Sequence, residues 1–475
     1  MSVAPFRSSS MPSRWQRGWS LLKQAMSGAD QNYTEGSIGR AVLLLAIPMM
    51  LEMAMESVFA IVDIFFVSGL GAAAVAAVGL TEAVLTLLYA VAIGLSMAVT
   101  ALVARRIGAG DPEAAATVAG QTIWVGVGAA AIVAGIGIAY ADDILRLMGA
   151  EADVVASGAG YTALMLGGSV TILLLFLLNA IFRGAGDAAL AMRVLWLANG
   201  INIVLCPCFI YGLGPFPELG VTGAAVATNI GRGLGVLYAL YHLTNGRHRI
   251  TLRLRHLGIS SGVLATLLRV SAGGVLQFVI ATSSYIVLMR VVSQYGSAAI
   301  AGYTIAIRII MFTFLPAWGL SNAAATLVGQ NLGAGHPDRA ERSVWVTTKY
   351  NVIFLASIAV VFIAFAEPLV GIFSADPEVL AYGAACLRII SYGYGFYAVG
   401  LIVVQAFNGA GDTDTPTWLN LLCFWLIQLP LAYGLAEGLA YGPHGVFWAA
   451  AVSESLLAVF AVVMFRRGKW KLKVV

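Results

Sequence analysis

Long apolar runs follow one another from residue 38 to residue 466, and they limit the possible folds more than any other feature. A transmembrane helix needs about 20 apolar residues, and a soluble domain could not cover this much apolar surface. With 60% hydrophobic and only 11% charged residues, the chain is not a cytosolic enzyme, a secreted disulfide scaffold or a nucleic-acid-binding domain. The runs are too long and too uniformly apolar for a membrane β-barrel. They predict an all-α integral membrane protein with twelve transmembrane helices, near 38–67, 74–104, 114–140, 154–182, 188–212, 219–244, 262–292, 298–328, 344–366, 378–407, 416–437 and 444–466.

The connections between the runs alternate in charge, and this alternation predicts the orientation of the chain. Even-numbered connections and the C-terminal tail are basic, whereas odd-numbered connections are acidic apart from Arg146. Because basic loops stay in the cytoplasm, we expect both termini to be cytoplasmic and the protein to lie in the inner (plasma) membrane. The basic positions are Arg105, Arg106, Arg183, Arg193, 247–255, Arg339, Arg342, Lys349 and 466–473, and the acidic ones are Asp142, Asp143, Glu151, Asp153, Glu218, Glu367, Asp376 and Glu378.

The two halves of the chain are related by an internal repeat with an offset of 225 residues. GAGDP at 108–112 aligns with GAGHP at 333–337, and GAGD at 184–187 aligns with GAGD at 409–412. Six helices in each half make the repeats parallel, with a cavity between two lobes, a design typical of transporters. We divide the chain into a cytoplasmic N-terminal tail at 1–36, an N-lobe at 37–245, a basic cytoplasmic loop at 246–260, a C-lobe at 261–467 and a cytoplasmic C-terminal tail at 468–475.

Seven segments of the sequence, taken together, resemble the multidrug and toxic compound extrusion (MATE) family. Their combination is similar to the DinF-like branch of that family. The segments are 46–71, 102–112, 182–187, 202–212, 220–228, LVGQNLGAG within 319–335, and 407–418. The resemblance implies twelve helices in two lobes and cation-coupled efflux of organic cations and other drugs. It implies no enzymatic activity and no cofactor. The chain has no Walker motif, so we do not expect ATP to drive transport.

Asp63 is the first candidate for the coupling residue. It lies 15 residues after Pro48, about 22 Å along the same helix. An ionisable group in a membrane helix is costly and usually functional, and a buried carboxyl group takes up a proton readily. The resemblance implies that Asp63 is the essential N-lobe acid. Glu52 and Glu56 lie on nearly the same stripe of this helix, which predicts a proton path or a cation-binding face; a polar stripe facing a water-filled cleft is the alternative.

The resemblance also implies partners for Asp63 on two later helices. Asn202 matches the family asparagine beside the cation site, while Thr228 and Ala224 match positions that supply a hydroxyl and a backbone carbonyl. Cys206 stands where the family commonly has an aspartate. A thiol is a poor ligand for a hard cation, which prefers oxygen. We therefore expect H⁺ rather than Na⁺ as the coupling ion, and Glu56, where the family usually has Gln, is a candidate to replace the missing charge.

The C-lobe is expected to lack membrane acids of its own. Ala281 and Tyr397 occupy positions where another branch of the family carries carboxylates. Basic residues lie in its helices instead, at Arg290, Arg308 and Arg388. One hypothesis is that Glu82 and the other N-lobe acids attract these arginines when the outward mouth closes. The alternative is that each arginine extends to the membrane interface or pairs within its own lobe.

These observations predict a monomeric secondary transporter that exchanges H⁺, or alternatively Na⁺, for an amphipathic, cationic, drug-like compound by alternating access. Its partners are the substrate, the coupling cation and the lipid bilayer, with no nucleic acid. Two alternatives stay open: a lipid-linked precursor flippase of the same shape, which the C-lobe arginines favour, and a non-transporting membrane receptor or assembly protein, which Cys206 favours.

Overall fold

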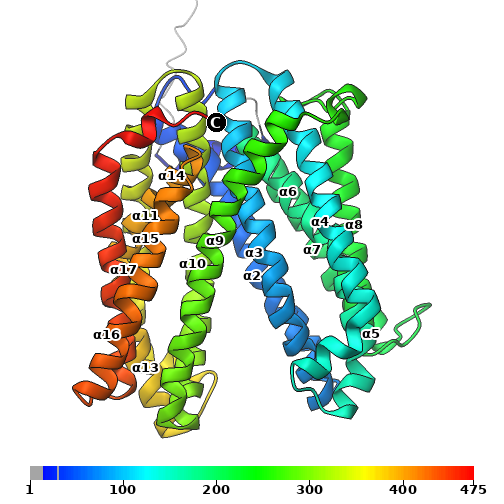
Figure 1. Cartoon of the computed structure of the whole chain (residues 1–475), viewed down its shortest axis with the longest axis vertical. Helices are drawn as coiled ribbons and strands as arrows, with labels where there is room; N and C mark the ends of the chain where they lie inside the picture. The colour runs from blue at the N-terminus through cyan, green and yellow to red at the C-terminus, as the bar shows by residue number, and fades with distance from the viewer. Residues whose placement is uncertain (1–13, 29–31) are drawn as a thin grey trace, which may run out of the picture.

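The computed structural model describes residues 14–28 and 32–475, and within these residues the chain is helical, without strands. Long helices are joined by short turns (Figure 1). The helices are α1 (Arg14–Ser27), α2 (Ile38–Ser68), α3 (Ala72–Gly108), α4 (Pro112–Leu147), α5 (Ala152–Gly167), α6 (Ser169–Ala185), α7 (Ala188–Tyr211), α8 (Val221–Thr244), α9 (Ser261–Val292), α10 (Ser297–Gly333), α11 (Pro337–Ala364), α12 (Ala366–Gly371), α13 (Pro377–Tyr392), α14 (Tyr394–Gly409), α15 (Asp414–Asn420), α16 (Leu429–Tyr433) and α17 (Pro443–Arg466). Two π-helical segments, η3 (Leu421–Gln428) and η4 (Gly434–Gly438), continue α15 and α16 into one span.

Twelve spans account for these helices apart from the short α1 and α12, as the sequence predicts. In the described part of the chain, nine spans are long and apolar enough to cross a membrane, and two bent pairs, α5 with α6 and α13 with α14, bring the total to eleven. The twelfth is α8, which has 24 residues and packs against α5, α6 and α7. The expectation of an all-α membrane protein with twelve helices is therefore confirmed.

The sequence analysis did not foresee the two bends. The predicted helices near 154–182 and 378–407 are each broken, by 40° at Gly168 and by 59° at Gly393, and these glycines are one repeat offset apart. A side chain on Gly168 would collide with Asn229, whose amide donates to the carbonyl oxygen of Leu164 at 2.9 Å. The close approach of α8 therefore requires glycine at the bend. Helix α1, within the segment expected to be a tail, was also not foreseen; it packs on α2 and α7.

The helices form two lobes that meet at one end and separate at the other. Helices α2 to α8 make the N-lobe and α9 to α17 make the C-lobe, and the two lobes diverge away from the C-terminus (Figure 1). We call the end with the C-terminus the closed end and the opposite end the open end. At the closed end α2 packs on α10, and α3 packs on α9 and α10.

Glycine allows the closest of these crossings. A Cβ atom on Gly94 of α3 would collide with the backbone of Gly274 and Val275, and one on Gly319 of α10 would collide with the backbone of Met49 and Met50. Gly94 and Gly319 are 225 residues apart, and so are the segments that they contact. The two crossings are therefore equivalent under the repeat, which places the pseudo-two-fold axis between them.

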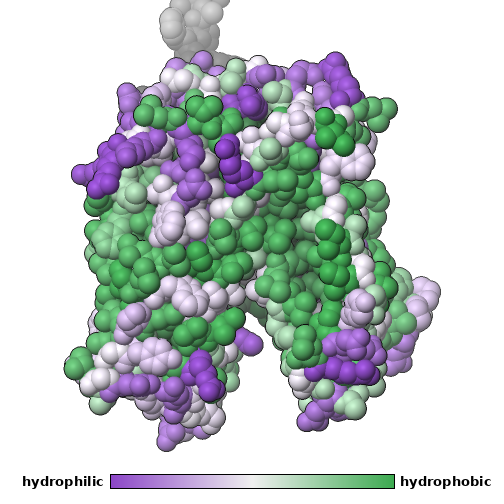
Figure 2. Space-filling model, in the orientation of Figure 1, coloured by the Kyte–Doolittle hydropathy of each residue, from purple (hydrophilic) through white to green (hydrophobic). Residues whose placement is uncertain are grey.

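The surface agrees with a membrane location. Figure 2 shows a broad hydrophobic band across the middle of the molecule, hydrophilic residues toward both ends, and a hollow between the lobes at the open end. Large apolar side chains are exposed on this surface, which water would not tolerate in such number but lipid does. Examples are Ile132, Ile138, Leu237, Val360, Trp418 and Leu426.

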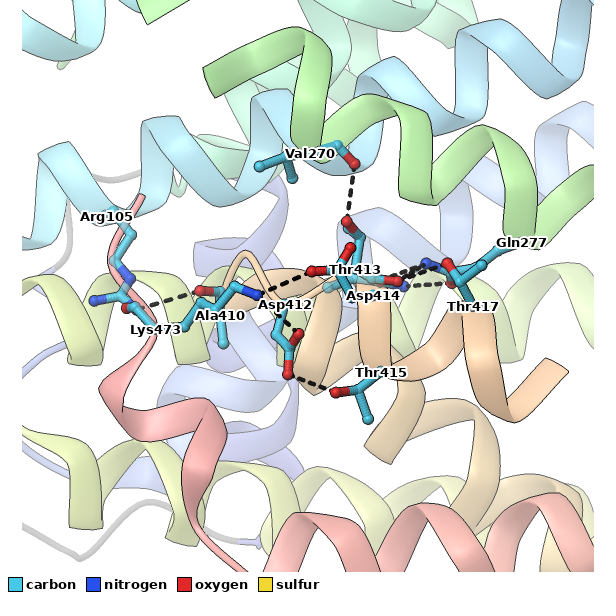
Figure 3. A network of polar contacts seen from close by, with 11 residues as sticks. Arg105, Val270, Gln277, Ala410, Asp412, Thr413, Asp414, Thr415, Thr417 and Lys473 are labelled. Atoms are coloured by element: carbon cyan, nitrogen blue, oxygen red, sulfur yellow. Dashed lines mark hydrogen bonds and ion pairs between the residues drawn. The ribbon is translucent and has the colours of Figure 1, made fainter. Parts of the chain in front are cut away.

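At the closed end the C-terminal tail joins the two lobes (Figure 3). Arg105 of α3, in the N-lobe, donates to the carbonyl oxygens of Lys473 at 2.6 Å and Ala410 at 3.2 Å, both in the C-lobe half of the chain. The Lys473 ammonium in turn pairs with Asp412 at 3.3 Å and Asp414 at 3.1 Å. We call Arg105 and the residues that it and Lys473 contact the tail clasp.

The repeat equivalent of Arg105 makes a similar contact in the opposite direction. Gln330 of α10 donates to the carbonyl oxygen of Gly184 at 3.0 Å, and Thr326, one turn earlier, donates to the carbonyl oxygen of Arg183 at 3.1 Å. Each lobe thus contributes a side chain that satisfies the C-terminal carbonyls of a helix in the other lobe. These bonds hold the closed end together.

Replacing Arg105 with alanine should weaken the closed end. The lost charged hydrogen bonds are worth about 1.5–3 kcal/mol, enough to shift a two-state population by about tenfold or more. Spin labels at Leu213 and Leu439, which are exposed in turns at the open end, should then report shorter distances than in the parent protein. The measurement is double electron–electron resonance in a background with the four native cysteines replaced by alanine.

The matched control is Lys469→Ala, which removes a basic but exposed residue from the same tail. It should leave the distance distribution unchanged. Identical distributions for the parent protein and Arg105→Ala would mean that the tail clasp does not hold the closed end.

Candidate ion-coupling site

A group of polar side chains lies inside the N-lobe, and we call it the N-lobe polar cluster. Its residues come from four helices. Within each helix the spacing places them on one face: Glu56 and Asp63 are two turns apart on α2, and Thr228 and Arg232 are one turn apart on α8. The cluster consists of Glu56 and Asp63 from α2, Glu82 and Tyr89 from α3, Asn199, Asn202 and Cys206 from α7, and Thr228 and Arg232 from α8.

Glu56 and Arg232, through the groups that they contact, link all four of these helices. The amide of Asn199 donates to Glu56 Oε2 at 3.0 Å, and the Arg232 guanidinium lies 3.8 Å from Glu56 Oε1. Arg232 also donates to the Tyr89 hydroxyl, at 3.3 and 3.4 Å from its two terminal nitrogens. A charge inside a membrane protein is stable only with such partners, so this network fixes Glu56 and Arg232 relative to one another.

Asn202 and Thr228 lie close together, as the resemblance implies. The Asn202 amide donates to the Thr228 hydroxyl at 2.8 Å, and both side chains are buried. Ala224 is buried one turn before Thr228 on the same face of α8. This pair supplies uncharged oxygen atoms between α7 and α8.

Asp63 lies beside Cys206, partly exposed on α2. The Cys206 thiol is 3.7 Å from Asp63 Oδ1, and it is the one side chain within hydrogen-bonding range of that carboxyl among the described residues. A thiol is a weak, neutral donor. Asp63 is therefore the least firmly paired acid of α2, and it can exchange a proton or a cation without breaking an ion pair.

Glu82 on α3 is exposed and makes no ion pair among the described residues, but it lies within electrostatic range of Asp63, Glu56 and Arg232. Its carboxyl group is thus the exposed member of the cluster, on the side of α3. The sequence analysis gives Glu82 a role in closing the outward mouth, and that role stays a prediction.

Glu52 belongs to a different site from Asp63. It is buried and pairs with Arg183 of α6 at 2.7 Å, with the Asn179 amide donating to the same oxygen at 3.1 Å. Glu52 shares the stripe of α2 with Asp63, but it lies nearer the closed end, where α6 covers Glu52.

The repeat equivalents of Glu52 and Arg183 are Gln277 and Asn408, and they also pair. The Gln277 amide donates to Asn408 Oδ1 at 3.0 Å. The same helix–helix contact is thus made by an ion pair in the N-lobe and by two amides in the C-lobe, which identifies the Glu52–Arg183 contact as one that holds helices together.

The three C-lobe arginines do not meet the N-lobe acids in this structure. Arg388 pairs with Glu367 at 3.0 Å, within its own lobe. Arg290 and Arg308 are exposed, and neither makes an ion pair among the described residues. The hypothesis that these arginines attract the N-lobe acids concerns a different state, in which the lobes meet at the end that is open here. It therefore stays a prediction.

The expectation that the C-lobe lacks membrane acids was wrong. Glu454 lies within α17 and is partly exposed, within electrostatic range of Tyr397 and Cys423. A comparison of equivalent positions could not find it, because its repeat equivalent is the neutral Asn229. Reading each apolar run for any ionisable residue would have found it.

The same reading would have found Arg232, which the sequence analysis also missed. It is a single charge in the middle of the run that forms α8, and its side chain is only 4% exposed. Among the described residues, no group of three or more His, Cys, Asp or Glu side chains is arranged to hold a metal ion.

A two-lobed bundle with polar groups beside a central hollow is the architecture of a secondary transporter. Comparison with known proteins agrees: the MatE family model matches residues 48–208 and 275–434, one match in each lobe. The chain therefore belongs to the multidrug and toxic compound extrusion (MATE) family of membrane transporters. The resemblance noted from the sequence is confirmed at the level of the family.

Two curated relatives and one solved structure cover nearly the whole chain. A probable multidrug resistance protein, NorM, of Thermotoga maritima is 27% identical over 443 residues, covering 92% of this chain and 94% of that protein. A FAD transporter of Shewanella oneidensis is 26% identical over 431 residues, covering 90% and 95%. A multidrug resistance MATE family transporter solved in an outward-facing conformation has a TM-score of 0.86 and 27% identity, with 93% of this chain and 98% of that chain covered.

Breaking the Glu52–Arg183 pair should destabilise the protein, whereas copying the C-lobe pair should not. Arg183→Asn alone leaves a buried carboxylate without its partner, which costs about 3–5 kcal/mol. The double variant Glu52→Gln/Arg183→Asn places two neutral amides where the C-lobe has Gln277 and Asn408, and it should recover most of the loss. The measurement is the apparent melting temperature of the purified proteins in detergent.

The double variant is its own control, because it carries the same arginine substitution as the unstable single variant. A double variant that melts as low as Arg183→Asn would contradict the interpretation that the unpaired charge causes the loss.

Proposed function

We propose that this protein exports amphipathic, cationic organic compounds in exchange for protons, with Asp63 as the coupling acid. Family membership and relatives named for multidrug resistance support export of drug-like compounds. The position of Asp63 carries the assignment of the coupling residue. It is an acid within a membrane helix, partly exposed, and held only by a weak neutral donor.

The exchange follows from the charge on Asp63. An ionised Asp63 offers a counter-charge to an organic cation in the hollow between the lobes, where desolvation strengthens the attraction. A proton on Asp63 removes that counter-charge, so the cation leaves. The buried Asn202–Thr228 hydrogen bond holds α7, which carries Cys206, against α8. Each turnover therefore moves a proton inward and a compound outward.

The proposed orientation places the closed end in the cytoplasm. The basic residues Arg105, Arg106 and Arg183 lie at helix ends there, and the basic segment 247–255 follows α8, while acids such as Glu218 and Glu378 lie at the opposite helix ends. This asymmetry supports cytoplasmic termini, with the hollow facing outward. Alternating access would then come from rocking of the two lobes about the crossings of α2 with α10 and α3 with α9.

Protons suit this site better than sodium ions. Sodium is a hard cation that needs several oxygen ligands, and Cys206 presents sulfur beside Asp63. A proton needs only one carboxyl oxygen. Glu56 does not replace the missing acid directly, because it is turned toward Asn199 and Arg232.

Two other functions find less support. A lipid-linked precursor flippase needs free positive charge in its cleft, and Arg388, one of three candidates, is neutralised by Glu367. A receptor or assembly protein needs no exchangeable acid beside a hollow.

Transport of an anionic compound has a specific argument in its favour, since one relative is named a FAD transporter and Arg232 is buried in the N-lobe.

Replacing Asp63 with asparagine should abolish proton-driven efflux, because the amide can neither release a proton nor attract a cation. The measurement is ethidium transport in proteoliposomes under separate H⁺ and Na⁺ gradients. The parent protein should transport under the H⁺ gradient. Asp63→Asn should not, although its gel-filtration profile should be unchanged.

Glu378→Gln is the matched control, since it neutralises an exposed acid in the first turn of α13, away from the N-lobe. It should transport as the parent protein does. Transport driven by Na⁺ alone would overturn proton coupling, and absence of ethidium transport by the folded parent protein would favour an anionic substrate or a non-transporting role.

A further inference from the structure

Two histidines and an aspartate form a chain of hydrogen bonds at the closed end of the N-lobe. His248, in the loop after α8, contacts Asp187 through its Nδ1 atom, which lies 2.7 Å from Asp187 Oδ2. The other ring nitrogen of His248, Nε2, lies 2.9 Å from Nδ1 of His242, in the last turn of α8. The His248 side chain is 23% exposed, so protons from the water can reach it. We call these three residues the histidine clasp.

The neighbours of the histidine clasp fix which ring nitrogens carry protons. An ionised Asp187 can only accept a hydrogen bond, so His248 Nδ1 donates to it. Asn245 Oδ1 accepts from the backbone N–H of Arg247 at 3.0 Å, which leaves the Asn245 amide nitrogen facing His242 Nδ1 at 3.4 Å. His242 Nδ1 is then an acceptor, and His248 Nε2 donates to it. The full set of contacts therefore needs a proton on both nitrogens of His248, which is its charged form.

The C-lobe makes the same contact with a lysine. The repeat offset converts Asp187 into Asp412 and His248 into Lys473, and Lys473 Nζ lies 3.3 Å from Asp412 Oδ1. A lysine keeps its charge at neutral pH, whereas a histidine gains or loses a proton between about pH 5 and pH 8. The equivalent position is thus a fixed ion pair in one lobe and a titratable one in the other.

The turn that carries Asp187 connects the histidine clasp to the C-lobe. Three successive backbone carbonyls of this turn, at 183–185, accept hydrogen bonds from side chains. The first two accept from Thr326 and Gln330 of α10, in the C-lobe. The third accepts from Arg249 at 3.1 Å. Because Arg249 adjoins His248, the contact between His248 and Asp187 keeps this loop on the turn that receives α10.

The other charged groups around the histidine clasp do not titrate near neutral pH. Arg193 and Arg247 lie within electrostatic range of His242, and Arg249 adjoins His248. All three arginines keep their protons under the conditions that proteins meet. The rings of Tyr238 and Tyr241 contact the His242 ring edge-on. Among the described groups at this site, a gain of positive charge near neutral pH is therefore a gain by one of the two histidines.

We propose that the histidine clasp is a pH-sensitive part of the closed end: a proton on His248 strengthens its contact with Asp187 and holds the two lobes in the arrangement seen here. As the pH falls, His248 gains a proton and its hydrogen bond to Asp187 becomes a charge-assisted one, which is about twice as strong. As the pH rises, His248 Nε2 loses the proton that it donates to His242, and the closed end loosens.

The location of this end in the cytoplasm belongs to the proposed function, and on that basis acidification of the cytoplasm would slow the opening of the transporter to the inside. The response of the lobes to pH does not depend on the orientation. It also does not depend on which ion or compound is transported, because His248 and Asp187 lie at the closed end, outside the N-lobe polar cluster.

Double electron–electron resonance between spin labels at Leu213 and Leu439 tests this inference without a transport step. The cysteine-free background also carries Asp63→Asn, which removes the response of the coupling acid itself. The ratio of long to short distances should be about two- to fivefold higher at about pH 5.5 than at about pH 8, the effect of a partly exposed ion pair.

Two substitutions of His248 should remove this response in opposite ways. His248→Lys copies the C-lobe pair and should keep the long distances at both pH values. His248→Gln can donate a hydrogen bond but carries no charge, so it should keep the distribution of the higher pH throughout. If either variant does not give a single gel-filtration peak, Asp187→Asn takes its place, and it should also show no response.

His336→Gln is the matched control, because His336 is an exposed histidine in the turn before α11. It should respond to pH as the parent background does. Equal distance distributions at the two pH values in the parent background would overturn the inference, and so would a response that persists in a folded His248 variant. Failure of the proposed function is seen elsewhere, as absence of proton-driven ethidium efflux, so the two failures can be told apart.

Discussion

The architecture depends on two helix crossings at the closed end, where backbone meets backbone. Gly94 rests on Gly274 and Val275, and Gly319 rests on Met49 and Met50. Because lipid gives helices no hydrophobic reason to associate, close packing and hydrogen bonds must hold membrane helices together. The crossings supply the packing and the tail clasp supplies hydrogen bonds. The crossings and the tail clasp all lie at the closed end of the molecule, so the lobes separate at the other end and leave a hollow there.

The second constraint is that every charge inside the membrane needs a partner, and the protein meets it in different ways. Glu52 and Arg183 neutralise each other and are buried, so they join helices. Arg232 lies 3.8 Å from Glu56 in a looser pair, while Asp63 has only a thiol beside it. A firmly paired charge holds helices together, whereas a loosely paired one can change its protonation without breaking an ion pair. This difference separates Glu52 from Asp63, although both lie on α2.

The sequence predicted the fold well and the site in part. Twelve apolar runs and one repeat offset were enough for the helix count and the two lobes, because bilayer thickness sets helix length. Asn202 and Thr228 were expected to lie together, and they do. The bend at Gly168 was not predictable, since it depends on Asn229 approaching from another helix. Arg232 and Glu454 were visible as charges in apolar runs but were missed, because the repeat and the resemblance directed attention elsewhere.

The sequence alone determined that the chain is a membrane protein and that its two halves are equivalent. It also determined that the first long helix carries acidic residues within an otherwise apolar run. These properties follow from composition and spacing, which a bilayer converts directly into helices. Only the tertiary structure showed that Glu52 is held in an ion pair whereas Asp63 is not. Glu52 and Asp63 lie on the same stripe of α2 but face different neighbours, Arg183 at one level and Cys206 at another. Pairing depends on the helices packed against α2, and the order of residues along one helix does not specify them.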